Sequence, residues 1–139
     1  MKQLKAAALV VSLLSAATAS EQHHARYFLM SDGDPRNDFV FELHDPKLIE
    51  QAITIIHMPN ESRPHVSGII DTSTVHYNAR WGFHYLPETI SFPDISAEVC
   101  DAETSYVQHH LKEVGGHFLP GNRWCPWNQK VVREVDTPP

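Results

Sequence analysis

The sequence predicts an α+β fold in which two helices pack on one face of a mainly antiparallel sheet. Short segments rich in β-branched and aromatic residues are separated by turn-forming clusters, and two longer segments have helical periodicity. Their order is strand, strand, helix, strand, strand, possible strand, helix, strand, which suits a mixed layer. Hydrophobic residues make up 42% of the 139 residues and charged residues 20%, as in ordinary globular proteins, and the length suits one domain.

Residues 1–19 have the pattern of a secretory signal peptide. A short basic start precedes an uncharged apolar run over residues 6–17, and the small residues at 17–19 fit a cleavage site. That run is shorter than the ~20 apolar residues that span a bilayer, and no later segment is long enough, so we expect no membrane span. We therefore expect a secreted, extracellular domain over residues 20–136, followed by a frayed tail over 137–139.

The first half of the domain has the clearest local signals. Two short apolar segments at 26–30 and 39–43 are separated by the turn-rich residues 31–38, which predicts two strands and a loop. Asp45 followed by Pro46 is a favoured helix start, and apolar residues follow at helical spacing. We predict a helix over 46–57.

The second half is less regular. Strands are predicted at 66–71 and 81–85, the latter from the alternation of large aromatic residues. Residues 95–99 alternate in the same way, although a helix starting near Pro93 fits almost as well. A helix over 101–114 is predicted from its apolar face, with Asp101 as its cap and two glycines after it. A last short strand is predicted at 130–135.

Cys100 and Cys125 are the only cysteines. In an oxidising compartment two cysteines predict one disulfide, and closing this loop stabilises the fold by about 3.5 kcal/mol in the chain-entropy picture. The alternative is a catalytic thiol activated by a neighbouring histidine. Asn60 begins an Asn-Glu-Ser sequon between two prolines, so in a eukaryotic secreted protein we expect a glycan on an exposed loop.

The chain contains 10 histidines, an unusual number for its length. Imidazole is the commonest protein ligand for transition metals, but the chain lacks the spacings that mark zinc sites. His109 and Glu113 would lie one helical turn apart, with His117 shortly after. The residues that we would test for a metal site are His84, His109, His110 and His117, and surface histidines without a metal are the alternative.

Trp124-Cys125-Pro126-Trp127 is the most distinctive local sequence. Two indoles beside a half-cystine either shield the disulfide within the core or present a stacking platform for a sugar or a peptide, which Trp81 could join. Acidic residues at 32–38 suggest a calcium loop, but the spacing of an EF-hand is absent and we expect a solvated turn.

Several function classes are excluded or disfavoured. The formal net charge of −6 disfavours a nucleic-acid binder, which needs a basic surface to neutralise phosphates. The chain has no Gly-x-Ser-x-Gly elbow and no phosphate-binding loop, so no motif identifies it as an enzyme and we lean against catalysis.

Several stretches resemble a small family, the N-terminal domain type named after a calmodulin-binding protein. The resemblance implies a compact domain stapled between the two cysteines, and the family's name implies calmodulin as a partner. Calmodulin targets are basic amphipathic helices, whereas both helices predicted here balance lysines with glutamates. The stretches that carry the resemblance are residues 39–46, 65–68, 77–84, 98–102, 114–116 and 124–127.

The favoured hypothesis is a secreted, disulfide-stapled binding or interaction module without catalysis of its own, with an unknown protein or carbohydrate partner and no cofactor. A histidine-rich metal-binding protein or metalloenzyme is the second hypothesis. The third is a secreted inhibitor or effector of a foreign enzyme, suggested by the small size, the export signal and the disulfide.

Overall fold

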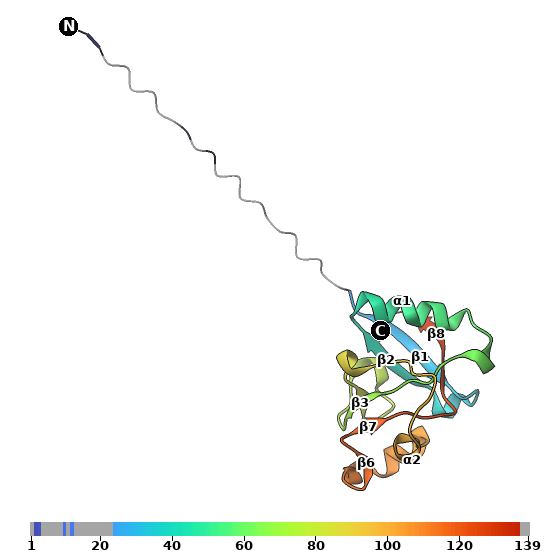
Figure 1. The fold of residues 1–139 in the computed structure, drawn as a ribbon. Helices are drawn as coiled ribbons and strands as arrows, with labels where there is room; N and C mark the ends of the chain where they lie inside the picture. The colour runs from blue at the N-terminus through green and yellow to red at the C-terminus, as the bar shows by residue number, and fades with distance from the viewer. Residues whose placement is uncertain (1, 4–9, 11, 13–23, 137–139) are drawn as a thin grey trace.

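A three-stranded antiparallel sheet joins the two ends of the described domain. The structure is a computed structural model, and it describes residues 2–3, 10, 12 and 24–136. Strand β1 (Arg26–Ser31) lies between β2 (Phe39–Leu43) and β8 (Lys130–Val135). Because Tyr27 pairs with Val135, the first and last strands lie side by side (Figure 1). Nearly all of the predicted leader, and the tail over 137–139, lie outside the described residues.

Helix α1 (Pro46–Ile56) follows directly after β2 and packs against β8. Its start is the predicted one, since the Asp45 side chain accepts a hydrogen bond of 2.8 Å from the backbone N–H of Lys47, and Pro46 occupies the first turn. Ala52 and Ile55 are its fully buried side chains and join the hydrophobic core. The helix therefore covers the core side of the first sheet with one apolar stripe.

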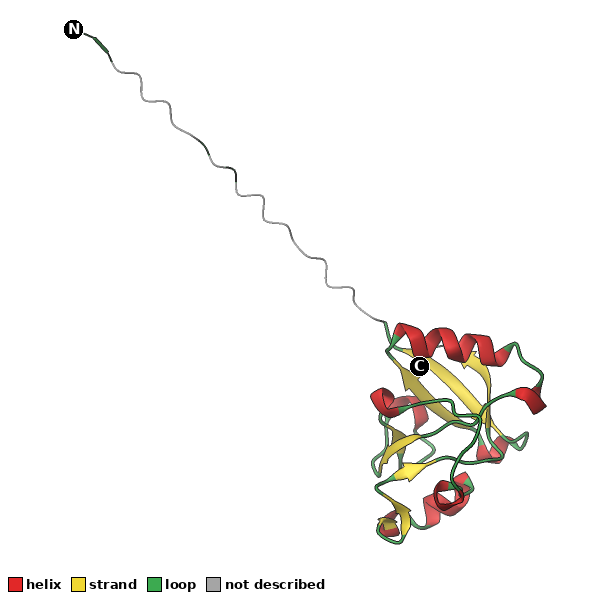
Figure 2. Ribbon diagram, in the orientation of Figure 1, coloured by secondary structure: helices red, strands yellow, loops and turns green. Residues whose placement is uncertain are grey.

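A second, smaller sheet lies below the first in Figures 1 and 2. It has the order β4-β3-β7, with antiparallel pairing throughout. A parallel two-stranded pair and the short helix α2 lie at the lower end of the domain (Figure 2). The bounds are β3 Gly68–Asp71, β4 His84–Tyr85, α2 Thr104–His109, β5 Val114–Gly115, β6 Phe118–Pro120 and β7 Arg123–Trp124.

The α+β class, the antiparallel three-stranded sheets and the disulfide are confirmed. The strands are divided between two three-stranded sheets and one pair, rather than joined in one sheet with both helices on one face. The predicted strands at 66–71 and 81–85 are shorter in the structure, where they are β3 and β4. Within the described residues, no helix is both long and apolar enough to cross a membrane.

Two predicted elements near the disulfide are wrong. Residues 95–99 form no strand; a 3-10 turn spans Glu98–Cys100, and Ile95 and Val99 are 89% and 63% exposed. The helix predicted over 101–114 is only Thr104–His109. It starts late because the Asp101 carboxylate accepts the backbone N–H of Trp127 instead of capping the helix, and it ends where His110 leaves helical geometry.

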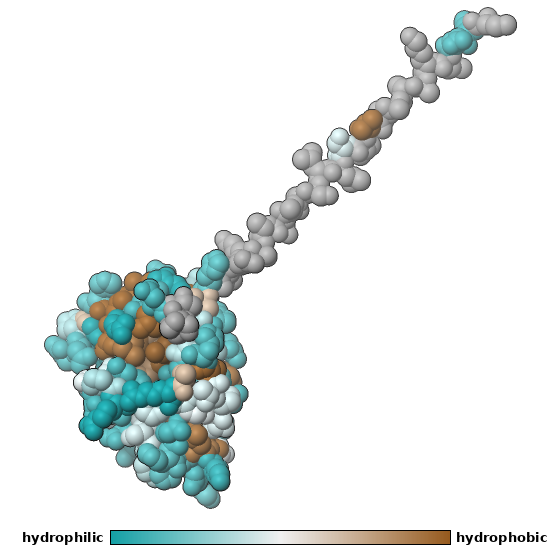
Figure 3. Space-filling model, turned by 180° about the vertical axis from the view of Figure 1, so that it is seen from behind, coloured by the Kyte–Doolittle hydropathy of each residue, from teal (hydrophilic) through white to brown (hydrophobic). Residues whose placement is uncertain are grey.

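The core is centred on the indole of Trp124, which is fully buried. Its ring stacks on Tyr85 at 5.1 Å between centroids and meets Phe39 and Phe83 edge-on at 5.0 and 5.2 Å. The hydroxyl of Tyr85 donates to the backbone carbonyl of Trp124 over 3.1 Å. Seen from behind, apolar side chains also gather at the surface in the upper part of the domain, while polar side chains cover most of the remaining face (Figure 3).

Candidate functional site

The disulfide between Cys100 and Cys125 is formed, as predicted, with 5.1 Å between the Cα atoms. Both cysteines are buried, and the backbone N–H of Cys125 donates to the carbonyl of Cys100 over 2.7 Å. The covalent bond and the backbone bond together fix the segment after β7 against the 3-10 turn Glu98–Cys100. A catalytic thiol is therefore not available at either position, because both sulfurs are in the bridge.

The three tryptophans do not form one surface. Trp81 is 6% exposed and donates its indole N–H to the carbonyl of Asp38 over 2.8 Å. Trp124 is fully buried and donates to the carbonyl of Ala102 over 2.9 Å. Both indoles serve the core with their polar atoms satisfied, whereas Trp127 is 38% exposed. Of the three proposed platform residues, Trp127 alone presents its ring to solvent.

Trp127 is held in place from two sides. Its backbone N–H donates to Oδ1 of Asp101 over 2.9 Å, and it follows the buried Pro126 and the half-cystine Cys125. A proline and a disulfide both reduce the freedom of the segment before any ligand binds. An exposed indole on such a segment loses little conformational entropy when it is covered by a partner.

The ring of His65 lies beside the indole of Trp127, with 6.4 Å between centroids. His65 is itself fixed, because its backbone N–H donates to the carbonyl of Pro93 over 2.9 Å. Its Nδ1 atom is enclosed and has no hydrogen-bond partner among the residues that the structure describes. Burial lowers the pKa of His65, as does the positive charge of Lys130, so the ring favours its neutral form.

A groove of about 460 Å³ runs along α1 beside this region. Ile55, Met58 and Phe92 give it an apolar lining, while Lys47 and Glu50 line its polar side. Phe92 precedes Pro93, the residue that is hydrogen-bonded to His65, so the groove and the Trp127 surface share one supporting segment. The volume lies within the range of small-ligand pockets.

The predicted metal ligands are not assembled into a site. No group of three or more histidines, cysteines, aspartates and glutamates within the described residues could hold a metal ion. His84 bonds through Nδ1 to the carbonyl of Ser73 over 2.8 Å, and His109 bonds to that of Ser105 over 2.7 Å. His117 is exposed, and the helix ends before Glu113, which removes the helical spacing to His109.

His110 belongs to an aromatic cluster instead. Its ring stacks on Tyr106 at 3.9 Å between centroids, and Phe118 meets both rings edge-on. Its Nδ1 bonds to the carbonyl of Tyr106 over 2.8 Å. Tyr106 is 51% exposed, so this cluster forms a second aromatic surface near α2, one that the sequence analysis missed because Tyr106 and Phe118 carried no motif.

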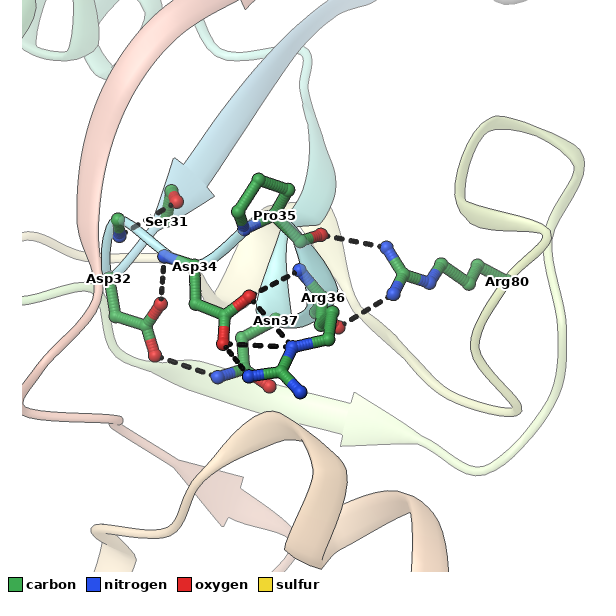
Figure 4. A network of polar contacts seen from close by, with 8 residues as sticks. Ser31, Asp32, Asp34, Pro35, Arg36, Asn37 and Arg80 are labelled. Atoms are coloured by element: carbon green, nitrogen blue, oxygen red, sulfur yellow. Dashed lines mark hydrogen bonds and ion pairs between the residues drawn. The ribbon is translucent and has the colours of Figure 1, made fainter.

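The loop at 31–38 is the polar turn that was expected. Oδ1 of Asp32 accepts the backbone N–H of Asp34, and Oδ2 accepts the side-chain amide of Asn37, each over 2.8 Å (Figure 4). Asp34 pairs with Arg36, whose side-chain hydrogen bond lowers the pKa of Asp34 to about 2. Arg80 closes the loop by donating to two of its carbonyls.

Asn60 is exposed at the start of the 3-10 turn Asn60–Ser62, and its glycosylation stays a prediction.

The residues that complete the candidate site were not found from the sequence. His65 lies far from Trp127 along the chain and carries no motif of its own. Asp101 was interpreted as a helix cap, whereas it anchors Trp127. The signal that was available is the pairing of an exposed aromatic residue with a disulfide and a proline in Trp124-Cys125-Pro126-Trp127.

Fold and site together define a small, disulfide-bonded α+β domain with an exposed indole beside its bridge. The family model for the N-terminal domain named after a calmodulin-binding protein matches residues 24–138, and the chain therefore belongs to this family. The resemblance found in the sequence is thus confirmed. No curated protein and no solved structure matches the chain.

Proposed function

We propose that the chain is an exported binding module, made rigid by its disulfide, that contacts a protein or carbohydrate partner through Trp127 and performs no catalysis of its own. The signal-peptide pattern over residues 1–19 supports export. The disulfide between Cys100 and Cys125 agrees with an oxidising compartment.

One observation carries the proposal: Trp127 is exposed although the backbone around it is fixed. A tryptophan that served only the core would be buried like Trp81 and Trp124. Exposed tryptophans on rigid segments are frequent energetic anchors of interfaces, because they bury a large area at low cost in side-chain entropy. The groove along α1, next to the same segment, extends the surface that a partner could cover.

The name of the family does not extend this proposal to calmodulin. Helix α1 carries Lys47 against Glu50, and α2 has six residues without a lysine or arginine. Neither is the basic amphipathic helix that calmodulin binds.

The test is binding of the labelled, disulfide-intact protein to a glycan array and to a panel of cell-surface and matrix proteins. We expect Trp127→Ala to abolish a specific signal given by the wild type. Tyr106→Ala is the matched control, because it removes another exposed aromatic ring, one that belongs to the separate cluster near α2. Binding that survives Trp127→Ala and is lost in Tyr106→Ala would move the site to α2, and hydrolysis of any panel member would contradict the non-catalytic proposal.

A further inference from the structure

A small cavity lies between the turn after β1 and the segments on either side of the disulfide. Its volume of about 10 Å³ is the space of a single water-sized sphere. Its lining includes the carboxylates of Asp32, Asp101 and Glu103 and the amide side chains of Asn128 and Gln129. Residues from three separate parts of the chain thus bring oxygen-bearing groups around one point.

Gln129 has a side-chain oxygen without a partner. The residue is 2% exposed, and its Nε2 donates to the carbonyl of Asn37 over 2.9 Å and to Oγ1 of Thr104 over 2.6 Å. Because a backbone carbonyl can only accept, the bond to Asn37 fixes which end of the amide is nitrogen. Oε1 is enclosed and unpaired among the described residues. Neither partner of Nε2 lines the cavity, so Oε1 is the end of the amide that is turned toward it.

The carboxylates nearest to this oxygen also lack a counter-charge. The backbone is extended at both Asp101 and Glu103, and residues two apart in an extended segment project to the same side. Oδ1 of Asp101 accepts the N–H of Trp127, which leaves the other oxygen available. Within the described part of the chain, none of Asp32, Asp101 and Glu103 forms an ion pair with a lysine, arginine or histidine.

We propose that this cavity binds a divalent hard cation, in particular Ca²⁺. All the converging groups are oxygens, and Ca²⁺ takes carboxylate, amide and water oxygens together. A water molecule could satisfy Oε1 of Gln129, but it would leave the negative charge of the carboxylates uncompensated.

The set of ligands is a mixed one. Because no three acids of the described chain are grouped to hold a metal by themselves, carboxylates supply only part of the coordination. Oε1 of Gln129, the Asn128 side chain and water supply the rest. Such a site is weak, and we expect a dissociation constant on the order of 10⁻⁴ to 10⁻³ M, as in extracellular calcium modules.

The ion would tie the turn after β1 to the disulfide segment. This site is independent of the proposed binding surface, since no group that would hold the ion is the indole of Trp127. The expectation of a solvated turn was correct for residues 32–38 taken alone. The cavity arises because the fold sets Asp32 against residues that follow the two cysteines.

The experiment is calorimetric titration of chelator-treated, disulfide-intact protein with Ca²⁺, with thermal melts in parallel. Glu103→Gln tests the site, because this residue is exposed and its change should not prevent folding. Glu98→Gln is the matched control, an exposed glutamate outside the cavity. We expect Ca²⁺ to raise the melting temperature of the wild type by a few degrees, and Glu103→Gln to weaken binding about tenfold while Glu98→Gln leaves it unchanged.

Mn²⁺ locates the ion directly. As a paramagnetic substitute it should broaden the NMR signals of the Gln129 side-chain amide and the Trp127 backbone amide before those of Arg80. Absence of binding heat and of a thermal shift at millimolar Ca²⁺ would overturn the proposal. Equal weakening in the two glutamate variants, or broadening centred elsewhere, would overturn it as well.

Discussion

The imidazole of His65 and the indole of Trp127 are neighbours, with 6.4 Å between ring centroids and planes inclined by 45°. Each residue is anchored through its backbone N–H, His65 to Pro93 and Trp127 to Asp101. The pair therefore links the segment before β3 to the segment after the disulfide. Because Nδ1 of His65 is enclosed without a partner among the described residues, the charge of this ring affects both segments.

Acidification is expected to destabilise the fold through His65. Burial above all, and then the charge of Lys130, lower the pKa of His65 below its ordinary 6.5. Above that value the ring is neutral in both folded and unfolded chains, whereas below it the unfolded chain binds a proton that the folded chain resists. Stability is therefore full above about pH 6.5 and falls as the pH drops through the folded pKa. Urea unfolding at neutral and mildly acidic pH measures the loss.

His65→Gln should reduce this dependence on pH, since glutamine does not titrate. His117→Gln is the control, because His117 is exposed and should leave the dependence unchanged. Equal acid sensitivity in the wild type and in His65→Gln would show that other groups are responsible.

Two tryptophan substitutions should separate core from surface. Trp124→Ala removes the centre of the aromatic core and is expected to cost about 3–5 kcal/mol of unfolding free energy, enough to unfold most of the protein. Trp127→Ala removes a partly exposed ring and should cost about 1 kcal/mol or less. Thermal melts followed by circular dichroism compare them. A loss as large for Trp127 as for Trp124 would mean that Trp127 also serves the core.

The elements predicted well are those whose signals are local. β2, β8 and the start of α1 lie where the sequence places them, because alternation, Asp45 and Pro46 determine them within a few residues. The region between β3 and β7 depends instead on distant partners. Ile95 and Val99 alternate like strand residues, but no strand pairs with them, and the chain turns outward before Cys100.

The site was predictable only in part, for a similar reason. The sequence marks Trp124 and Trp127 equally, and which indole is buried depends on Phe39 and Tyr85, which reach Trp124 from other strands. Asp101 had a local interpretation as a helix cap, and a tertiary hydrogen bond to Trp127 replaced it. The histidines were numerous enough to suggest a metal, yet the two adjacent ones at the end of α2 bond to carbonyls one turn before them.

Gly115 and Gly33 provide a comparison of strain with crowding. Both have positive φ, +90° and +98°, so alanine at either position is strained by about 1–2 kcal/mol. At Gly33 an added Cβ meets nothing, whereas at Gly115 it collides with Oδ1 of Asn122. Displacing Asn122 would also disturb its hydrogen bond to the carbonyl of Ile70, adding about 1 kcal/mol. Chemical denaturation should therefore rank Gly115→Ala below Gly33→Ala in stability, and equal losses would mean that Asn122 moves aside freely.

Removing the disulfide should loosen the Trp127 surface as well as the fold. The bridge closes a loop with a sequence separation of 25, and in the chain-entropy model its loss costs about 3.5 kcal/mol. The double variant Cys100→Ala with Cys125→Ala is preferable to serines, because both positions are buried and unpaired hydroxyls would add a cost of their own. Urea unfolding gives the free energy, and tryptophan fluorescence should shift to the red in the folded baseline as Trp127 gains freedom. If the midpoint falls but the fluorescence does not change, the bonds from Asp101 and from the Cys100 carbonyl hold this segment without the bridge.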